Sequence, residues 1–376
     1  MGLTGPIGPI SLIIHSYGVC CLSKLTDIHE CYAHNPLPPD LFQQVSGELG
    51  VRLEACYDDI GLKHPIIVAP GQVTLTVPGL RTLRRAGYAG CVLKSLVGED
   101  VNGICKMIAQ RKKPTHITTV YDPEDTAGAC PVIHWDGRCD ARTLSDYLPF
   151  ASQARSLHKP GDFAVIASIL CHLPRPGEDV SKEEWLHTTA AIADLGYTHI
   201  EIDFCPFLSS DDYTEDQRNV LNWYRTLPAL MKSIRADIKV FPKMLNLEWG
   251  LDYQIRIADA AVQGGADGLV VANRFFKKEY NSAHGGWELR KRNLAQVTAI
   301  HERFPELALS ATGGVYAGEH VLAYLRAGAR NVQVLSFIMG QVRTPFAKTD
   351  GTKSEKVLHK LLLDPVDGLF AALLRE

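Results

Sequence analysis

The segment Glu201-Ile202-Asp203-Phe204-Cys205-Pro206-Phe207 has the pattern of a β-strand that ends at a proline. Its residues alternate in character as they do along a strand, and a proline cannot donate a backbone hydrogen bond to a sheet. The thiol of Cys205 therefore stands where a strand gives way to a loop. If the strand belongs to a parallel barrel, this is the end at which barrel enzymes build their active sites.

Similar apolar runs rich in β-branched residues recur along the chain, and amphipathic segments with helical spacing alternate with them. The apolar runs are Pro65–Ala69, Gly90–Lys94, Phe163–Leu170, His199–Phe204, Ile238–Lys243, Gly268–Asn273, Leu307–Thr312 and Asn331–Phe337. The amphipathic segments are Val77–Ala86, Lys182–Leu195, Asp216–Ile234, Leu251–Gly264, Leu289–Arg303 and Glu319–Ala327.

This alternation indicates a parallel sheet whose strands are buried on both faces. Eight such strands predict a (β/α)8 barrel, also called a TIM barrel, in the α/β class. A doubly wound sheet is the alternative, but no GxGxxG motif follows the first strand.

Two regions fall outside this rhythm. Residues 1–60 precede the first strand and are predicted to form a short helical extension or cap, which leaves residues 61–376 for the barrel. The segment from Pro114 to His158 interrupts the interval between the second and third strands. Its turn-forming residues predict a loop or a small strand insertion, the kind of insertion that becomes a lid or a subunit contact.

The composition excludes several classes of protein. The net charge is -3 and the basic residues are not clustered, which argues against nucleic acid or an anionic membrane surface as a partner. No run of 18 uncharged apolar residues is present, and the N-terminus lacks a basic signal-peptide region. Ten scattered cysteines without a CxxC pair suit reduced thiols in the cytoplasm. Their spacing with histidine predicts no metal site.

A glycine-rich turn follows the seventh strand at Ala311-Thr312-Gly313-Gly314-Val315, and a helix is predicted to open shortly after it. Glycines allow a phosphate to approach the backbone closely, and N–H groups at a helix start point at it. Phosphate sites of barrels lie at this position. A simple tight turn is the alternative. A second pair, Gly285-Gly286, follows the sixth strand.

Two lysines, Lys94 and Lys243, end the second and fifth strands. A buried lysine without an anionic partner is costly, so both are predicted to face a bound anion or a carboxylate. Solvated strand-end lysines are the alternative. Asn273 ends the sixth strand with an amide that both donates and accepts. For Cys205 the alternative role is that of a small buried apolar residue.

In this order, these residues resemble the dihydroorotate dehydrogenase family of FMN-dependent barrels, from about Gly61 to Met339. The matching features are Pro65–Gly71, Lys94 with Ser95, Cys205-Pro206, Lys243, Asn273, Gly285-Gly286 and the turn Thr312–Val315.

The resemblance implies a role for each position. Cys205 would remove a proton next to a carbonyl while hydride leaves the neighbouring carbon for the flavin. Lys243 would stabilise negative charge on the reduced flavin, and Lys94 would contact flavin and substrate. The implied FMN-binding set is Ala69, Gly71, Lys94, Ser95, Lys243, Asn273, Gly285, Gly286, Gly313, Gly314 and Ser336.

The chain also departs from the family pattern. Asp203 and Phe207 stand where the family has asparagines that bind orotate, and a further asparagine is not evident near Asp136-Gly137-Arg138. Buried polar groups without partners cost about 1–3 kcal/mol each, so a small non-orotate substrate is predicted, contacted by Asp203, Phe207 and Asn273. Leu335-Ser336-Phe337 replaces the family's Gly-Thr-Ala at the phosphate site, and leucine removes the closest backbone approach.

The sequence therefore predicts a flavin-dependent oxidoreductase that acts on a carbon–carbon bond next to a carbonyl, with Cys205, Lys94 and Asp203 as catalytic residues. Asp203 would tend to raise the pKa of the Cys205 thiol by like-charge repulsion. One alternative is a flavin-independent barrel enzyme that uses Cys205 for proton transfer or covalent catalysis. Another is a non-catalytic binding subunit. Relatives with this cysteine are soluble dimers, which implies a cytoplasmic homodimer.

Overall fold

A computed structural model describes residues 18–51, 55–121, 131–137, 139–204, 216–277, 282–341 and 346–376. For residues 18–20 and for Asp136 it describes the backbone alone. Among these residues, no helix has both the length and the apolar character needed to cross a lipid bilayer.

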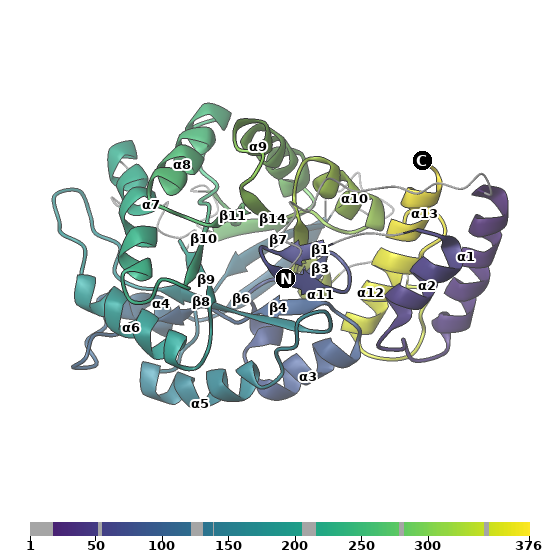
Figure 1. Cartoon of the computed structure of the whole chain (residues 1–376), viewed down its shortest axis with the longest axis horizontal. Coiled ribbons are helices and arrows are strands. Elements are labelled where there is room, and N and C mark those ends of the chain that lie inside the picture. The colour runs from purple at the N-terminus through teal and green to yellow at the C-terminus, as the bar shows by residue number, and fades with distance from the viewer. Residues whose placement is uncertain are drawn as a thin grey trace, which may run out of the picture.

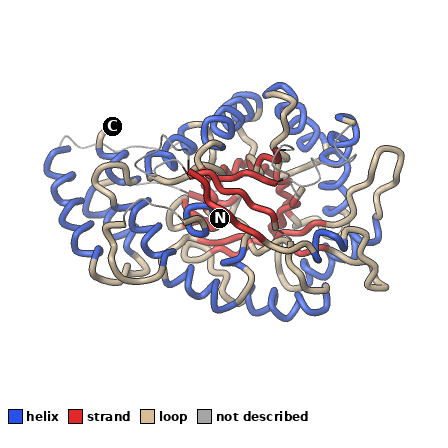
Figure 2. The backbone as a smooth tube through the Cα atoms, turned by 180° about the vertical axis from the view of Figure 1, so that it is seen from behind, coloured by secondary structure: helices blue, strands red, loops and turns tan. Residues whose placement is uncertain are grey.

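Eight parallel strands form a closed barrel at the centre of the molecule (Figure 2). Each strand pairs with its neighbours in chain order, and the last pairs with the first through Val332 and Ile66. The barrel strands are β3 (Ile66–Val68), β4 (Gly90–Val92), β8 (Ala164–Leu170), β9 (His199–Asp203), β10 (Lys239–Lys243), β11 (Gly268–Val271), β14 (Ala308–Thr312) and β15 (Asn331–Val334). The short strand β5 (Leu96–Val97) pairs with the carboxyl end of β8. The predicted (β/α)8 barrel is confirmed.

Helices follow the strands and surround the barrel. They are α3 (Val77–Arg85), α5 (Leu144–Arg155), α6 (Lys182–Asp194), α7 (Gln217–Lys232), α8 (Leu251–Gln263), α9 (Leu289–Arg303), α10 (Gly318–Arg326) and α12 (Lys353–Leu363). The first residues of these helices are set by local hydrogen bonds. Before α3, for example, the Thr76 side chain accepts a hydrogen bond from the backbone N–H of Gly79, the usual N-cap contact. Three shorter helices are η1 (Gln72–Thr74), α4 (Ile108–Lys112) and α11 (Ser336–Met339).

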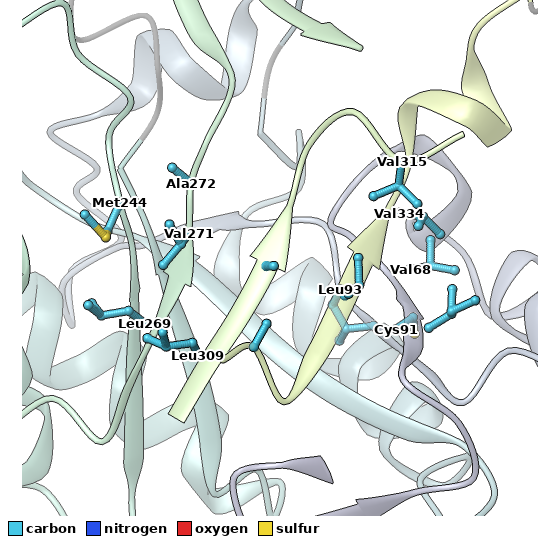
Figure 3. Packing of buried hydrophobic residues seen from close by; sticks show 14 of the residues in the cluster. Val68, Cys91, Leu93, Met244, Leu269, Val271, Ala272, Leu309, Val315 and Val334 are labelled. Carbon is cyan, nitrogen blue, oxygen red and sulfur yellow. The ribbon is translucent and has the colours of Figure 1, made fainter. Parts of the chain in front are cut away.

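Two apolar layers hold the barrel together. Between strands and helices, side chains such as Val68, Leu269 and Val334 pack in one continuous cluster (Figure 3). Inside the barrel a smaller cluster contains Ile67 and Phe241. Alternating strand residues supply the two layers, because successive side chains point to opposite faces.

The eighth strand is shorter than predicted. The run Asn331–Phe337 was expected to be extended throughout, but β15 ends at Val334 and helix α11 begins at Ser336. Within the predicted insertion at 114–158, residues from Leu144 onward form α5, which is the barrel helix between β4 and β8. The strand part is a hairpin of β6 (His116–Tyr121) and β7 (Pro131–Asp136).

This hairpin belongs to a four-stranded antiparallel sheet. Strands β12 (Phe275–Lys277) and β13 (Ser282–Gly286) come from the loop after β11, and β13 pairs with β7 in the order β12-β13-β7-β6. Two loops at the carboxyl ends of barrel strands are thus joined into one sheet.

The opposite end of the barrel is closed by a second hairpin, β1 (Ala55–Tyr57) and β2 (Ile60–Leu62). Tyr57 is fully buried and its ring lies 4.7 Å from that of Phe241. The hairpin spans the boundary at residue 60 that the sequence predicts between extension and barrel.

The preceding residues form α1 (Gly18–Ala33) and α2 (Leu41–Leu49), in the region where the sequence predicts a helical extension or cap. Helix α1 packs against α12 and α13 (Leu369–Leu374), so the two ends of the described chain lie side by side (Figure 1).

Candidate functional site

A cavity opens at the carboxyl ends of the barrel strands and contains about 680 Å³ of space, including open solvent. Its lining comes from seven of the eight barrel strands or the loops after them and from the four-stranded sheet. The lining residues are Ala69, Pro70, Lys94, Trp135, Asp203, Lys243, Ala272, Asn273, Arg274, Gly285, Leu289, Thr312, Gly313, Gly314, Val315, Gln333, Val334, Leu335 and Ser336.

The two predicted lysines converge on this cavity. Lys94 and Lys243 are 6% and 8% exposed. Within the described part of the chain, neither ammonium group forms a hydrogen bond or an ion pair. Burial lowers the pKa of Lys243, and the carboxylates of Glu201 and Asp203 oppose this shift. Two buried cations beside an open cavity constitute a site for an anionic group.

Asp203 lies on the cavity wall. It is the residue that pairs with Lys243 in the register of the neighbouring strands β9 and β10. Its Oδ2 accepts a hydrogen bond from the Ser95 hydroxyl at 2.8 Å, and its Oδ1 accepts one from the Asn273 amide at 3.1 Å. Ser95 is fully buried, lies 2.9 Å from the hydroxyl of Ser168, and is absent from the cavity wall. Its observed contact is therefore to Asp203.

Asn273 uses its polar atoms within the protein. Its Nδ2 donates to Asp203 and to the carbonyl of Phe204, and its Oδ1 accepts from the backbone N–H of Arg274. An amide has two N–H donors, so both are engaged. In this geometry Asn273 orients Asp203, and donating a hydrogen bond to substrate requires one of the two Nδ2 bonds to break, whereas Oδ1 keeps a second lone pair.

Below Asp203 on the same strand, Glu201 points into the barrel and is fully buried. Its Oε1 accepts hydrogen bonds from Tyr57 at 2.8 Å and from Gln333 at 2.5 Å. Burial raises the pKa of Glu201, and Lys243 counteracts this. Glu201 and Gln333 were missed by the sequence analysis, although Glu201 stands two residues before Asp203 and so shares its face.

The glycine-rich turn follows β14 and borders the cavity. Gly313 and Gly314 have φ values of 101° and 68°, which disfavour other residues. A Cβ at Gly314 would approach Arg290 Cβ to 2.5 Å. The backbone N–H groups of Gly314 and Val315 donate to no acceptor among the described residues. They are therefore available to an anion.

The second glycine pair lies in strand β13 and does not form a turn. Gly285 borders the cavity, where an added Cβ would lie 3.2 Å from Ser336 Oγ. Gly286 is outside the lining, and its missing side chain makes room for the carbonyl of Pro131 on β7. Gly286 thus serves strand pairing.

The bulky residues after β15 leave the cavity open. Leu335 borders it, and a Cβ added to Gly71 would come within 2.5 Å of Leu335 Cδ2. The leucine side chain therefore lies over Gly71, which is itself outside the cavity lining, whereas Ala69 is part of it. Phe337 is buried away from the cavity and packs against Tyr316 and Phe346.

Trp135 and Arg274 form part of the cavity wall that the sequence analysis did not predict. The Arg274 guanidinium lies 5.0 Å from the Trp135 ring centre and donates to its carbonyl oxygen. Trp135 belongs to β7, and no sequence signal indicated that this hairpin reaches the site. Cys205, Phe207 and Arg138 lie outside the described residues, as does the side chain of Asp136.

Comparison with known proteins gives a consistent result. No family model matches the chain. It is 25% identical over 303 residues to the catalytic subunit of dihydroorotate dehydrogenase B (NAD(+)) from Methanocaldococcus jannaschii, across 77% of this chain and 87% of that protein. The fold matches a crystal structure of DHODH from Eimeria tenella in complex with ferulenol, with a TM-score of 0.59 and 14% identity over 95% of this chain and 96% of that one. The predicted resemblance to dihydroorotate dehydrogenases is confirmed.

Proposed function

We propose that this dihydroorotate dehydrogenase-like barrel is an FMN-dependent oxidoreductase that acts on a carbon–carbon bond next to a carbonyl in a small, non-orotate substrate. The observation that carries the proposal is the pair Lys94 and Lys243. Both are buried, both border the cavity, and neither ammonium group forms a hydrogen bond or an ion pair within the described part of the chain. A group with delocalised negative charge would supply the missing partner.

The donors around the cavity suit FMN. The N–H groups of Gly314 and Val315, which have no acceptor among the described residues, suit a phosphate, as does the Ser336 hydroxyl on the cavity wall. Gln333 presents a carboxamide whose Oε1 has no partner among the described residues. Its two N–H donors are used by Glu201 and Ser310, so the amide offers this oxygen as an acceptor to an N–H group of the flavin ring. The side chain of Leu335 packs over Gly71, and Leu335 also borders the cavity.

FMN, when bound, supplies hydride-transfer chemistry. The protein contributes a fixed positive charge at Lys243, held above the buried carboxylate of Glu201. Such preorganised charge stabilises developing negative charge where water is excluded. Cys205 directly follows Phe204, and we propose it as the acid or base that moves the substrate proton.

The polar groups at Asp203 favour a substrate other than dihydroorotate. A carboxylate accepts hydrogen bonds and donates none, and the neighbouring donors of Asn273 are already used within the protein. At position 203 the cavity wall therefore offers carboxylate acceptors to the substrate, whereas an asparagine at the same position would also offer N–H donors. We propose a substrate that presents an N–H or amino group to Asp203.

The test is the absorbance spectrum of the purified protein, mass spectrometry of any released small molecule, and FMN titration of stripped protein. We expect one FMN per chain. Lys243→Gln should weaken FMN binding about tenfold or more, as expected for a lost buried charge contact. Lys239→Gln, on the same strand but 37% exposed at its side chain and paired with Asp267, is the control.

A colourless protein that does not bind added FMN contradicts the proposal and favours the flavin-independent enzyme. If FMN binds, Cys205→Ala should keep the flavin and lose turnover. Turnover in that variant would remove Cys205 from the mechanism. Reduction of the bound flavin by dihydroorotate at a rate typical of enzymes would contradict the non-orotate substrate.

We further propose a homodimer in the cytoplasm. The exposed apolar residues Val101, Ile104 and Ile108, on the loop and helix that follow β5, support a subunit contact. Light scattering that gives the mass of one chain would contradict the dimer.

A further inference from the structure

Three side chains that can bind metals meet at the closed end of the barrel, on the far side from the cavity. Asp58 and Asp59 form the turn between β1 and β2, and His199 begins β9. One ligand atom from each of the three lies within 4.8 Å of the others. The hairpin that closes the barrel base is therefore placed against the strand that carries Asp203.

The distances suit a shared ion. His199 Nε2 lies 3.0 Å from Asp59 Oδ1 and 3.8 Å from Asp58 Oδ2. With metal–ligand bonds of about 2.0–2.1 Å, two ligand atoms of a tetrahedral site lie roughly 3.3 Å apart. The observed distances fall on both sides of this value, so a small shift of the two aspartates would complete three ligand positions.

The histidine supplies a second, independent observation. His199 is 4% exposed, yet its Nε2 forms no hydrogen bond with a described residue. Asp59 is near enough but lies off the direction that a hydrogen bond requires. The near neighbours of this nitrogen are the two carboxylates, at ion-pair distance, and a buried ring nitrogen without a hydrogen bond is rare. It is explained when its lone pair is directed at an ion.

The surroundings fix the ring. The other ring nitrogen, Nδ1, lies 3.0 Å from the hydroxyl of Thr198, the kind of second contact that sets the tautomer of a metal-binding histidine. The ring also stacks on Phe241, with centroids 5.9 Å apart. The Arg330 guanidinium lies 3.9 Å from Oδ1 of Asp58, whereas the other oxygen, Oδ2, is the one that faces His199. Its charge reduces the affinity for a cation and leaves Oδ2 available.

We propose that Asp58, Asp59 and His199 bind a divalent transition-metal ion of the zinc class, with water completing the coordination. One imidazole and two carboxylates suit zinc, cobalt or manganese better than calcium, because the nitrogen ligand favours the transition metals. The ion would fasten the β1–β2 hairpin to β9. This site is independent of the proposed flavin chemistry. The sequence analysis predicted no metal site, because His199 is separated from Asp58 and Asp59 by about 140 residues.

The experiment uses the full chain, treated with a chelator and dialysed, in a phosphine reductant. Zn²⁺ binding is measured by titration calorimetry, and Co²⁺ binding by its visible absorption, which distinguishes nitrogen and oxygen ligands from thiolates. We expect one ion per chain and no thiolate band. Asp59→Asn should weaken binding at least tenfold, and because Asp59 has a 68% exposed side chain this variant should fold normally.

His199→Asn should abolish the site. Asp237→Asn, at a 57% exposed aspartate paired with Arg235, is the matched control and should bind as the parent does. Absence of stoichiometric binding overturns the proposal. Equal affinity in Asp59→Asn places the ion elsewhere, a thiolate band with Co²⁺ places it on cysteines, and either result overturns the proposal.

Discussion

At the scale of single residues, Glu184 on α6 makes the stability depend on pH. It is 1% exposed, its Oε2 accepts a hydrogen bond from the backbone N–H of His172, and burial raises its pKa to about 7. An acid whose pKa is higher in the folded state stabilises that state most below its unfolded pKa of about 4.5. This contribution is lost as the pH rises through about 7.

Glu184→Gln removes this titration. Urea unfolding at pH 5 and pH 8 should show a smaller loss of stability at pH 8 for the variant than for the parent. Glu183→Gln, at the exposed neighbouring position, is the control and should follow the parent. If Glu184→Gln and the parent lose stability equally, the titration of Glu184 is not a source of the pH dependence.

The residues that line the cavity were only partly predictable. Strand-end position and residue type identified Lys94, Lys243 and the glycine turn, because barrel topology brings strand ends together. The same reasoning could not show that Asn273 donates to Asp203 and to the carbonyl of Phe204, because hydrogen-bond partners depend on side-chain geometry. Gly286 was assigned to phosphate but serves strand pairing.

At the scale of elements, the β1–β2 hairpin connects the barrel base to the site. The Tyr57 hydroxyl donates to Glu201, two residues from Asp203. Tyr57→Phe removes this donor and leaves a buried carboxylate with less support, at a cost of about 1–3 kcal/mol.

Chemical denaturation measures that cost. Tyr32→Phe, at a partly buried tyrosine whose hydroxyl has no hydrogen-bond partner in the described part of the chain, should change stability little. A Tyr57→Phe protein as stable as the parent would show that Gln333 alone satisfies Glu201.

The antiparallel sheet was the element least accessible from sequence. β6 is half exposed along its length and pairs with β7, and β7 pairs with β13 about 150 residues later. The sequence of β6 lacks the continuous apolar run of a barrel strand. Pairing between two loops depends on where the barrel places them, which local sequence does not encode.

At the scale of the whole molecule, eight apolar runs were sufficient to predict the barrel, because both faces of each strand are buried. They were not sufficient to predict that α1 packs against α12 and α13. Leu25 on α1 is fully buried in the same apolar cluster as the barrel helices. This places the terminal helices in the main core.

Leu25→Ala should therefore destabilise the protein by about 2–5 kcal/mol. It should also lower the midpoint of a single unfolding transition, which calorimetry can record. Lys24→Ala, at a 48% exposed neighbour, is the control. A separate early transition in the Leu25 variant would mean that the terminal helices unfold on their own.

Closure of the barrel has a consequence for synthesis on the ribosome. The first barrel strand, β3, can pair with its second neighbour only after Asn331–Val334 has been translated, and the four-stranded sheet at the cavity can form only after Ser282–Gly286 has been translated. A nascent chain therefore exposes two unpaired strand edges through most of its elongation. Chaperone engagement should be heaviest during that interval and end soon after β15 leaves the exit tunnel.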